Sequence, residues 1–383
     1  MRTAKWRHSL LLILALALLL PPKAAAGEEA PTLSAEAAIL VEPVTGQVLF
    51  EKNADRPMKA ASTVKILTAL VALEHLDPAQ EVTVDPAWTG IEGSSMYLRA
   101  GETVTVKDLL YGLLLVSGND AATALACAAA GSVAAFTELM NRKASALGMA
   151  DSRFADPCGL VSEGHRVTAR DMATLTRAAL ENALIAEIVA TKSATAADRS
   201  LVNHNKLLWR YEGAMGVKTG FTKAAGRTLV SCAEREGLRL ICVTLNDPDD
   251  WEDHAALLDW GFGSFTWRSS EGLRWTLPVV SGEAESVSVM PGREETLFLP
   301  KEGAGHWAVD LPDFVYAPVS AGEEIGRLRF LGPDGAVLGD VPLVFAEDVG
   351  LDPAQSLSFL EKLKWAWFFA WRHSPPYPIN MIW

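Results

Sequence analysis

The sequence predicts a mixed α/β (α+β) fold: an antiparallel sheet with an all-helical insert, then a small all-β C-terminal domain and an amphipathic C-terminal helix. Three observations support it. β-prone runs lie at both ends of the first 265 residues, patterns of helical period lie between them, and short alternating runs begin after about residue 270. At roughly 100 to 200 residues per domain, a chain of 383 residues is expected to form two folded domains.

The strands of the sheet are expected from two distant parts of the chain. The runs 37–41 and 46–51 are β-prone and are joined through Pro43 and Gly46, which is typical of a hairpin. Three more strands are predicted at 215–222, 227–234 and 238–245, the last two linked by a tight turn at Glu236 and Gly237. Between these groups and after them, apolar residues at helical spacing predict helices over 62–76, 106–116, 121–130, 132–147, 169–182 and 253–260.

The last third of the chain has a different pattern. Alternating runs at 273–280, 286–289, 295–299, 307–311, 325–330 and 341–345 predict a small β-sandwich over 271–350. Beyond it, Leu360, Leu363, Trp367 and Trp371 fall on one helical stripe, and Trp and Lys side chains favour the lipid headgroup boundary. We therefore expect an amphipathic membrane-interface helix over 355–373 and a tail over 374–383. A helix packed on its own domain is the alternative.

The first 26 residues have the pattern of a secretory signal peptide. Basic residues including Arg2, Lys5 and Arg7 precede an apolar run over 10–20, and small residues follow up to Ala26. An uncleaved anchor is the alternative, but eleven apolar residues are far fewer than the roughly 20 that span a bilayer. We expect cleavage after Ala26 and an extracytoplasmic mature protein.

Charge and cysteine content exclude some classes of function. The chain has 34 Lys and Arg against 47 Asp and Glu, and loss of the four basic residues in 1–26 changes the net charge from -13 to -17. So acidic a chain is a poor nucleic-acid binder, because phosphate contacts require clustered Lys and Arg. The spacing of Cys127, Cys158, Cys232 and Cys242 matches no metal-ligand pattern, and no metal or cofactor is expected. A disulfide between Cys232 and Cys242 and free buried thiols both remain open, with free thiols favoured.

Ser62-Thr63-Val64-Lys65 opens the first long helical pattern. A cation in the first turn is unfavourable by about 0.3 to 1 kcal/mol because it meets the positive end of the helix dipole. Residues i and i+3 share a helix face, so the Lys65 amine can reach the Ser62 hydroxyl. Partial burial in that field favours the neutral amine, which suits Lys65 to accept a proton from Ser62, while backbone N–H groups at the helix start can stabilise an oxyanion.

Two further triplets of residues with reactive or hydrogen-bonding side chains follow later in the chain. Ser117-Gly118-Asn119 lies at a predicted helix end, where a hydroxyl and an amide can face Ser62 across a cleft. Lys218-Thr219-Gly220 lies on a predicted strand, where Gly220 leaves the strand edge open to a ligand. Each triplet alone is a weak signal. Together, 55 and 101 residues apart, they match the S-x-x-K, S-x-N and K-T-G order of penicillin-recognising enzymes.

With these motifs the sequence resembles the serine D-alanyl-D-alanine carboxypeptidases, the low-molecular-mass penicillin-binding proteins. The similar blocks are 57–69, 114–121, 156–160, 203–208 and 216–222, and the resemblance covers residues 33 to 265. It implies a penicillin-binding, β-lactamase-like catalytic domain, placed at 32–268. It also implies a peptidoglycan stem peptide ending in D-Ala-D-Ala as substrate, and β-lactam antibiotics as inhibitors.

The resemblance also implies roles for individual residues. Ser62 would be the acylated nucleophile, Lys65 the general base, and Ser117 the hydroxyl that passes a proton to the leaving D-alanine. Asn119 would hold a substrate amide, and Lys218 and Thr219 would meet the terminal carboxylate, with help from Thr222. The oxyanion would be held by the backbone N–H groups of Ser62 and of Phe221, which follows Gly220.

Two alternatives and two departures from the family pattern stay open at this point. A class A-like β-lactamase would need a Glu in an E-x-x-L-N motif, which is absent between Ser117 and Lys218; a sensor that is acylated without turnover has the same motifs. Many family members carry an Arg after the K-T-G hairpin, but the stretch 246–254 is acidic and has none. Cys158 replaces an expected polar residue, and His165 and His254 are expected to be structural.

Overall fold

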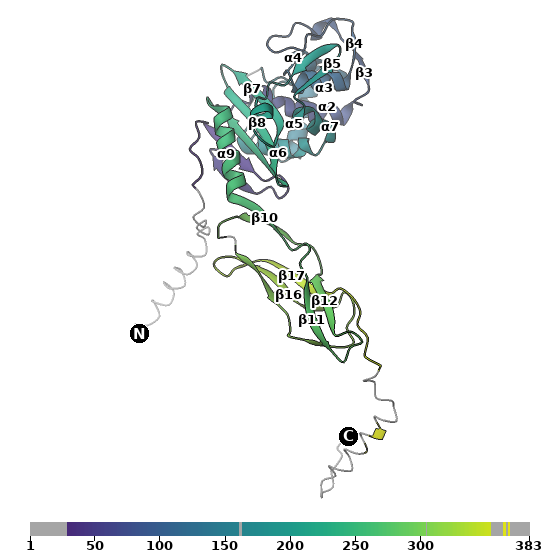
Figure 1. Cartoon of the computed structure of the whole chain (residues 1–383). Coiled ribbons are helices and arrows are strands. Elements are labelled where there is room, and N and C mark those ends of the chain that lie inside the picture. Colours follow the sequence, from purple (N-terminus) through teal and green to yellow (C-terminus); the bar gives the residue numbers. More distant parts are fainter. Residues whose placement is uncertain (1–28, 161–162, 304, 354–362, 365–366, 368–383) are drawn as a thin grey trace, which may run out of the picture. The chain divides into compact units, whose positions relative to one another are not determined.

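The computed structural model describes residues 29–160, 163–303, 305–353, 363–364 and 367 (Figure 1). They divide into two compact units, one ending at Phe265 and the other beginning at Thr266. The predicted signal peptide, the tail over 374–383 and almost all of the predicted helix over 355–373 lie outside the described residues.

The first unit contains a five-stranded antiparallel sheet in the order β2-β1-β9-β8-β7. Its strands are β1 (Ala37–Val41), β2 (Val48–Lys52), β7 (Ala214–Thr222), β8 (Gly226–Arg235) and β9 (Leu238–Leu245). The prediction that distant segments form one sheet is confirmed, because β1 pairs directly with β9. The strand β7, which carries the K-T-G motif, lies at one end of the sheet and pairs through only one of its edges.

Helices of the insert pack on one face of this sheet, and α9 packs on the other. Apart from the short helix η2, described below, the helices of the first unit are η1 (Ala61–Val64), α2 (Lys65–His75), α3 (Val106–Leu114), α4 (Asn119–Ala130), α5 (Val133–Ala146), α6 (Ala169–Leu180), α7 (Ala183–Ala190), α8 (Leu207–Arg210) and α9 (Asp250–Ser264). Side chains alternate along β1: Ile39 and Val41 join the core of the helical region, while Leu40 approaches Gly261 of α9.

The insert is not purely helical. Two short antiparallel pairs accompany the helices, β3 (Glu81–Thr83) with β4 (Thr103–Thr105) and β5 (Ser193–Ala196) with β6 (Arg199–Val202). A short 3₁₀ helix, η2 (Pro86–Trp88), follows β3. No single helix among the described residues has the length and hydropathy of a membrane span; the bent pair α4 and α5, at 84°, meets that test only together.

The β8–β9 register decides the geometry of the two cysteines that flank the hairpin. Cys232 lies opposite Ile241, and Cys242 lies opposite Ser231. Because successive side chains point to opposite faces of a sheet, the two sulfur atoms lie on different faces. Both are buried free thiols, which confirms the favoured expectation.

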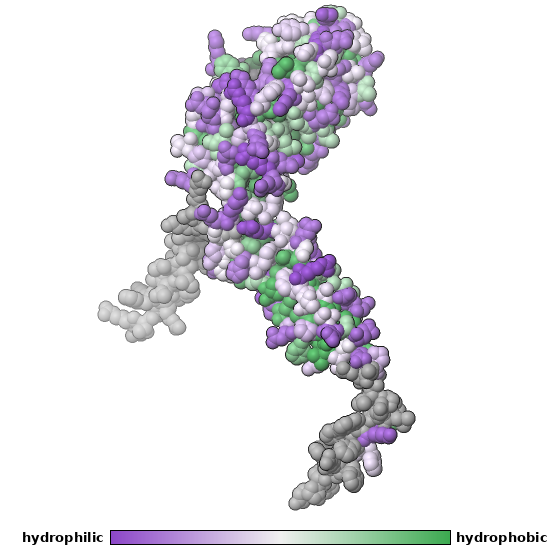
Figure 2. All heavy atoms as spheres, viewed as in Figure 1, coloured by the Kyte–Doolittle hydropathy of each residue, from purple (hydrophilic) through white to green (hydrophobic). Residues whose placement is uncertain are grey.

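The second unit is the small all-β domain that the sequence predicts. Its main sheet has the order β14-β16-β17-β12-β11-β15, and β10 pairs with β13. The strands are β10 (Phe265–Ser269), β11 (Trp275–Val280), β12 (Ser286–Pro291), β13 (Thr296–Pro300), β14 (His306–Asp310), β15 (Val315–Tyr316), β16 (Glu324–Leu331) and β17 (Val337–Phe345). Val289, Leu328 and Leu343 lie in its core. Figure 2 shows apolar residues on its surface, and Phe314 and Tyr316 are among the exposed ones.

Candidate active site

Ser62 lies in a tightly fixed turn at the start of the helical insert. The preceding residue, Ala61, has a left-handed backbone with φ of 47°, an unfavourable conformation for a residue with a side chain. The carbonyl oxygen of Ala60 accepts hydrogen bonds from the hydroxyls of Thr63 (2.7 Å) and Thr228 of β8 (2.9 Å). Two partners, one local and one from the sheet, therefore hold the turn that carries Ser62 against β8.

Lys65 is the centre of a buried polar cluster. It is completely buried, and its Nζ lies 2.9 Å from Ser62 Oγ and 3.3 Å from Ser117 Oγ. The same amine donates to Asn119 Oδ1 at 2.6 Å and to the Cys158 carbonyl oxygen at 3.2 Å. Ser62, Ser117 and Asn119 are thus gathered around the amine of Lys65, although 54 positions separate Lys65 from Asn119 in the chain.

The surroundings of Lys65 favour a proton acceptor. Burial lowers the pKa of Lys65 to about 8, and the nearby carboxylates of Asp156 and Asp120 only partly oppose that shift. The amide oxygen of Asn119 and the backbone carbonyl next to Lys65 can only accept hydrogen bonds. A neutral amine can donate to both and keep its lone pair for the hydroxyl of Ser62.

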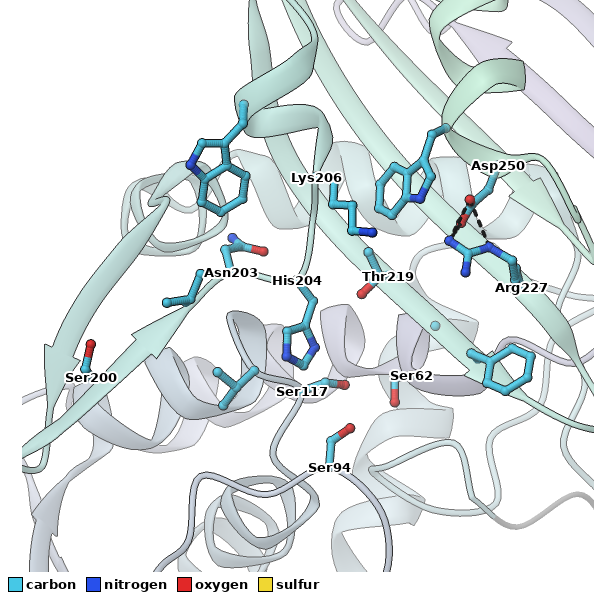
Figure 3. A pocket seen from close by; sticks show the side chains of 16 residues that line it. Ser62, Ser94, Ser117, Ser200, Asn203, His204, Lys206, Thr219, Arg227 and Asp250 are labelled. Atoms are coloured by element: carbon cyan, nitrogen blue, oxygen red, sulfur yellow. Dashed lines mark hydrogen bonds and ion pairs between the residues drawn. The ribbon is translucent and has the colours of Figure 1, made fainter.

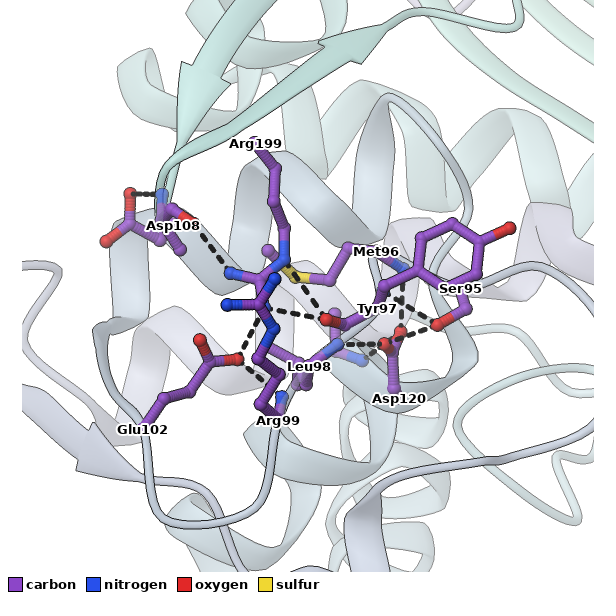
Figure 4. Close-up of polar contacts among 11 residues, drawn as sticks. Ser95, Met96, Tyr97, Leu98, Arg99, Glu102, Asp108, Asp120 and Arg199 are labelled. Atoms are coloured by element: carbon purple, nitrogen blue, oxygen red, sulfur yellow. Dashed lines mark hydrogen bonds and ion pairs between the residues drawn. The ribbon is translucent and has the colours of Figure 1, made fainter.

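Ser117 and Asn119 are held at the start of α4. Ser117 has a φ of 61°, a strained value, and Asn119 Nδ2 donates to the Glu92 carbonyl oxygen at 2.6 Å. The next residue, Asp120, is buried and accepts hydrogen bonds from the backbone N–H groups of Met96 and Leu98, both at 3.0 Å (Figure 4). These contacts fix the loop beside the cleft and the position of Asn119 together.

A second turn supplies the carbonyl that Lys65 contacts. Asp156 Oδ1 accepts hydrogen bonds from the backbone N–H groups of Cys158 (2.6 Å) and Gly159 (2.7 Å). A side chain on Gly159 would overlap the carbonyl oxygen of Ala61, so the two turns are in direct contact. The role of Cys158 therefore lies in its backbone carbonyl, while its thiol is buried near the Asn119 carbonyl oxygen at 3.6 Å.

The edge strand β7 passes directly beside Ser62. A Cβ atom on Gly220 would lie 3.0 Å from both the Ser62 nitrogen and the Ala60 carbonyl oxygen. Lys218 is buried, its Nζ donates to the Thr219 carbonyl oxygen at 2.9 Å, and burial together with the positive charge of Lys65 lowers its pKa well below the usual value.

Other predicted residues of β7 face different directions. Phe221 is exposed, while Thr222 Oγ1 accepts the backbone N–H of Ala225 at 3.0 Å. The structure thus brings Thr219, Gly220 and Phe221 to the cleft that contains Ser62, whereas Lys218 and Thr222 are not among its lining residues.

Comparison with known proteins agrees with this geometry. Residues 24–249 match the family model described as D-alanyl-D-alanine carboxypeptidase, peptidase family S11. The chain belongs to this family. It is 31% identical over 357 residues to the D-alanyl-D-alanine carboxypeptidase DacF of Bacillus subtilis, covering 87% of this chain and 90% of the relative. It is also 34% identical over 365 residues to DacC of Escherichia coli, covering 86% and 89% of the two chains.

Solved structures show the same relationship. Penicillin-binding protein 6B from Escherichia coli aligns with a TM-score of 0.68 and 28% identity, over 83% of this chain and 98% of that one. Penicillin-binding protein 5 from Haemophilus influenzae aligns with a TM-score of 0.65 and 28% identity, over 85% and 100%. The chain is a serine D-alanyl-D-alanine carboxypeptidase of the S11 family, and the β-lactamase alternative is not favoured.

In this carboxypeptidase the site opens into a cleft of about 880 Å³ (Figure 3). Five residues that the sequence singles out are among those that line it: Ser62, Ser117, Thr219, Gly220 and Phe221. The sequence did not predict the other lining residues, which include Ser94, Ser200, His204, Lys206, Trp209, Arg227, Asp250 and Trp251. His204 and Lys206 belong to a block that carries the family resemblance, and this was the one signal that could have identified them.

Arg227 enters this cleft from β8 and pairs with the start of α9. Its Nε and Nη2 donate to Asp250 at 3.0 Å and 2.7 Å. The acidic stretch 246–254 has no Arg of its own. Its Asp250 is instead the ion-pair partner of Arg227, which lies on the β7–β8 hairpin. Phe221 and Arg227 lie opposite each other in the β7–β8 register. The predicted hairpin could therefore have indicated that Arg227 lies near the site.

The two histidines near the motif blocks are buried in the carboxypeptidase. His254 Nδ1 and Nε2 lie 2.6 Å from Ser231 Oγ and 2.9 Å from Thr244 Oγ1, and burial lowers its pKa to about 3. His165 packs edge-on against Phe154 with ring centroids 5.7 Å apart. In the described part of the chain, no group of three or more His, Cys, Asp or Glu side chains has a metal-binding arrangement.

Proposed function

We propose that this enzyme removes the terminal D-alanine from peptidoglycan pentapeptides through an acyl-enzyme on Ser62. The observation that carries the proposal is the 2.9 Å contact between Ser62 Oγ and the buried Lys65 amine, whose pKa is lowered to about 8. A base with a pKa near the working pH has both a useful neutral fraction and enough basicity to remove the hydroxyl proton.

Acylation uses the groups around Lys65. The Ser62 hydroxyl proton passes to the Lys65 amine as Oγ forms a bond to the carbonyl carbon of the penultimate D-alanine. The developing oxyanion accepts hydrogen bonds from the backbone N–H groups of Ser62 and Phe221. Ser117 Oγ, 3.3 Å from Lys65 Nζ, carries the proton on to the leaving nitrogen, and D-alanine departs as the peptide bond breaks.

Deacylation reverses these roles with water as the nucleophile. Water loses a proton to the neutral Lys65, its oxygen bonds to the acyl carbon, and the ester bond to Ser62 breaks as Oγ recovers a proton. The peptide leaves one residue shorter. A β-lactam forms the same ester on Ser62, and its leaving group stays tethered to the acyl chain.

Substrate recognition uses the free edge of β7. An extended peptide that adds to this edge gains backbone hydrogen bonds, and Gly220 allows it to lie against the strand beside Ser62. Asn119 is proposed to hold a substrate amide. The Thr219 hydroxyl is proposed to meet the terminal carboxylate, with Lys218 behind it and Thr222 further along the strand.

Release of D-alanine is the decisive experiment. A pentapeptide ending in D-Ala-D-Ala should lose one alanine, and the same peptide ending in L-Ala-L-Ala should stay intact. The Ser62→Ala variant should release none and should not be labelled by a fluorescent penicillin. Labelling without D-alanine release by the native enzyme would support the sensor alternative, and labelling of Ser62→Ala would reject the nucleophile.

We also propose that the protein is exported and held at the outer face of the cytoplasmic membrane. The support is the sequence alone: the leader pattern over 1–26 and the amphipathic pattern over 355–373, which carries Trp365, Trp367 and Trp371. A chain truncated after Asp352 should stay in solution when anionic vesicles are sedimented, while the mature full chain should pellet. Equal pelleting of both chains would reject the anchor.

A further inference from the structure

The charges around the cleft leave one cation available to a ligand. Among the described residues that line the cleft, the fixed charges are Lys206, Arg227 and Asp250. His204 also lines it, but partial loss of hydration lowers the pKa of its ring, so it does not add a fixed positive charge. The site nevertheless has to bind a peptide that ends in a carboxylate.

Two of the cations near Ser62 already have partners within the protein. Arg227 forms a bidentate ion pair with Asp250, which neutralises its charge and occupies the Nε and Nη2 hydrogens. Lys218 does not line the cleft: its amine is buried and donates to the Thr219 carbonyl oxygen, and its lowered pKa favours the neutral form. Neither group offers an uncompensated positive charge to a carboxylate in the cleft.

Lys206 differs from both in exposure and in partners. It is exposed, and no described residue forms a hydrogen bond or ion pair with its amine. It precedes α8, which packs against β7, so its position next to the K-T-G strand is fixed by the fold. Figure 3 shows its amine extending toward Thr219 within the cleft.

We propose that the ε-ammonium of Lys206 pairs with the terminal carboxylate of the peptide while the Thr219 hydroxyl donates to the same group. This rests on the proposed function and names its specificity determinant. Lys206 makes the enzyme select leaving groups with a free carboxylate. From its place before α8, it supplies the positive charge that an Arg in the stretch 246–254 would have supplied. A charge-assisted hydrogen bond of this kind corresponds to roughly tenfold or more in affinity.

The experiment compares two reactive substrates that differ only in this carboxylate. One is an N-acyl-D-alanyl thioester of thioglycolate, and the other is its methyl ester, which has no charge. For Lys206→Met, kcat/KM on the carboxylate substrate should fall about tenfold, mainly through KM, while the methyl ester changes less than about twofold. Lys206→Arg keeps a cation and should retain most of the selectivity. Raising the salt concentration should raise KM for the native enzyme and not for Lys206→Met.

Lys223→Met is the matched control, because Lys223 is exposed and lies outside the cleft lining. It should behave as the native enzyme on both thioesters. Unchanged selectivity in Lys206→Met, or an equal loss on both thioesters, would overturn the role of Lys206. A native enzyme that releases no D-alanine and turns over neither thioester would overturn the proposed function itself.

Discussion

A side chain on Gly220 would begin 3.0 Å from the backbone nitrogen of Ser62. That separation is shorter than most Cβ contacts in proteins, the atom that it meets belongs to a backbone turn held from two sides, and the same methyl would also overlap the hydroxyl of Thr228. We predict that Gly220→Ala reduces the rate of Ser62 acylation by at least about a hundredfold, since it displaces one proposed oxyanion donor and the strand edge together. The rate of labelling by a fluorescent penicillin measures this.

Gly263→Ala in α9 is the matched control for that substitution. Gly263 has no atom near its Cβ position and no left-handed backbone, so the added methyl meets nothing. Native labelling by Gly263→Ala and slow labelling by Gly220→Ala, with both proteins folded, is the expected pair of results. Native labelling by Gly220→Ala would contradict the close approach.

The pKa of Lys65, about 8, predicts a pH profile for acylation. The neutral amine is the active form, so the acylation rate should increase about tenfold per pH unit below 8 and level off above it. Lys65→Arg keeps the positive charge but cannot give up a proton, so it should lose acylation at every pH. Stopped-flow penicillin acylation tests both; a flat native profile from about pH 6 to about pH 9 would argue against a Lys65 base.

Asp156→Asn should shift that profile. The Asn oxygen can still accept the N–H groups of Cys158 and Gly159, so the turn is retained, but the negative charge that raises the pKa of Lys65 is removed. The acidic limb should move to lower pH by roughly half a unit to one unit. An upward shift would show that the carboxylate does not act on Lys65 through its charge.

Asp120 should be a stability residue. Its buried carboxylate accepts the backbone N–H groups of Met96 and Leu98 and the hydroxyl of Ser95. Asp120→Ala leaves these donors unpaired and should lower the free energy of unfolding by about 3 kcal/mol. Asp120→Asn keeps one acceptor oxygen and should lose clearly less. Urea unfolding followed by helical circular dichroism measures both, because the helices α2 to α9 lie in the first unit; equal losses would contradict the assignment.

Much of the fold follows from local patterns. The strands β7, β8 and β9 and the helices α2 to α6 carry periodic apolar residues, and each was predicted within a few positions of its observed bounds. The hairpin β5–β6 was missed because Ala197 and Asp198 occupy its turn with φ of 47° and 59°, where Asn and Gly would be the usual signal. The helix α7 was missed because seven of its eight residues are apolar, so its sequence shows no contrast between an apolar and a polar face.

The candidate site likewise combines contacts that local sequence patterns predict with contacts that arise only in the folded chain. The contact of Ser62 with Lys65 follows from i, i+3 spacing on a helical turn, and motif order singled out Ser117 and Asn119, which lie within hydrogen-bond distance of the Lys65 amine. No local pattern relates Lys65 to the Cys158 carbonyl, 93 positions away, since that contact depends on a turn held by Asp156. Lys206 lies in a block that carries the family resemblance, but no local pattern shows that Arg227 has an ion-pair partner and that Lys206 has none among the described residues, because pairing is a property of the folded chain.

The buried thiols bear on how the enzyme would survive in an oxidising compartment, where the proposed export would place it. Burial raises the pKa of Cys158 to about 11 and of Cys232 to about 12, and that of Cys242 well above its usual value. At neutral pH only about one thiol in ten thousand, or fewer, would be the reactive thiolate. An oxidising compartment would therefore act on these sulfur atoms very slowly, and the catalytic unit keeps its reduced cysteines without pairing them or depending on a disulfide catalyst.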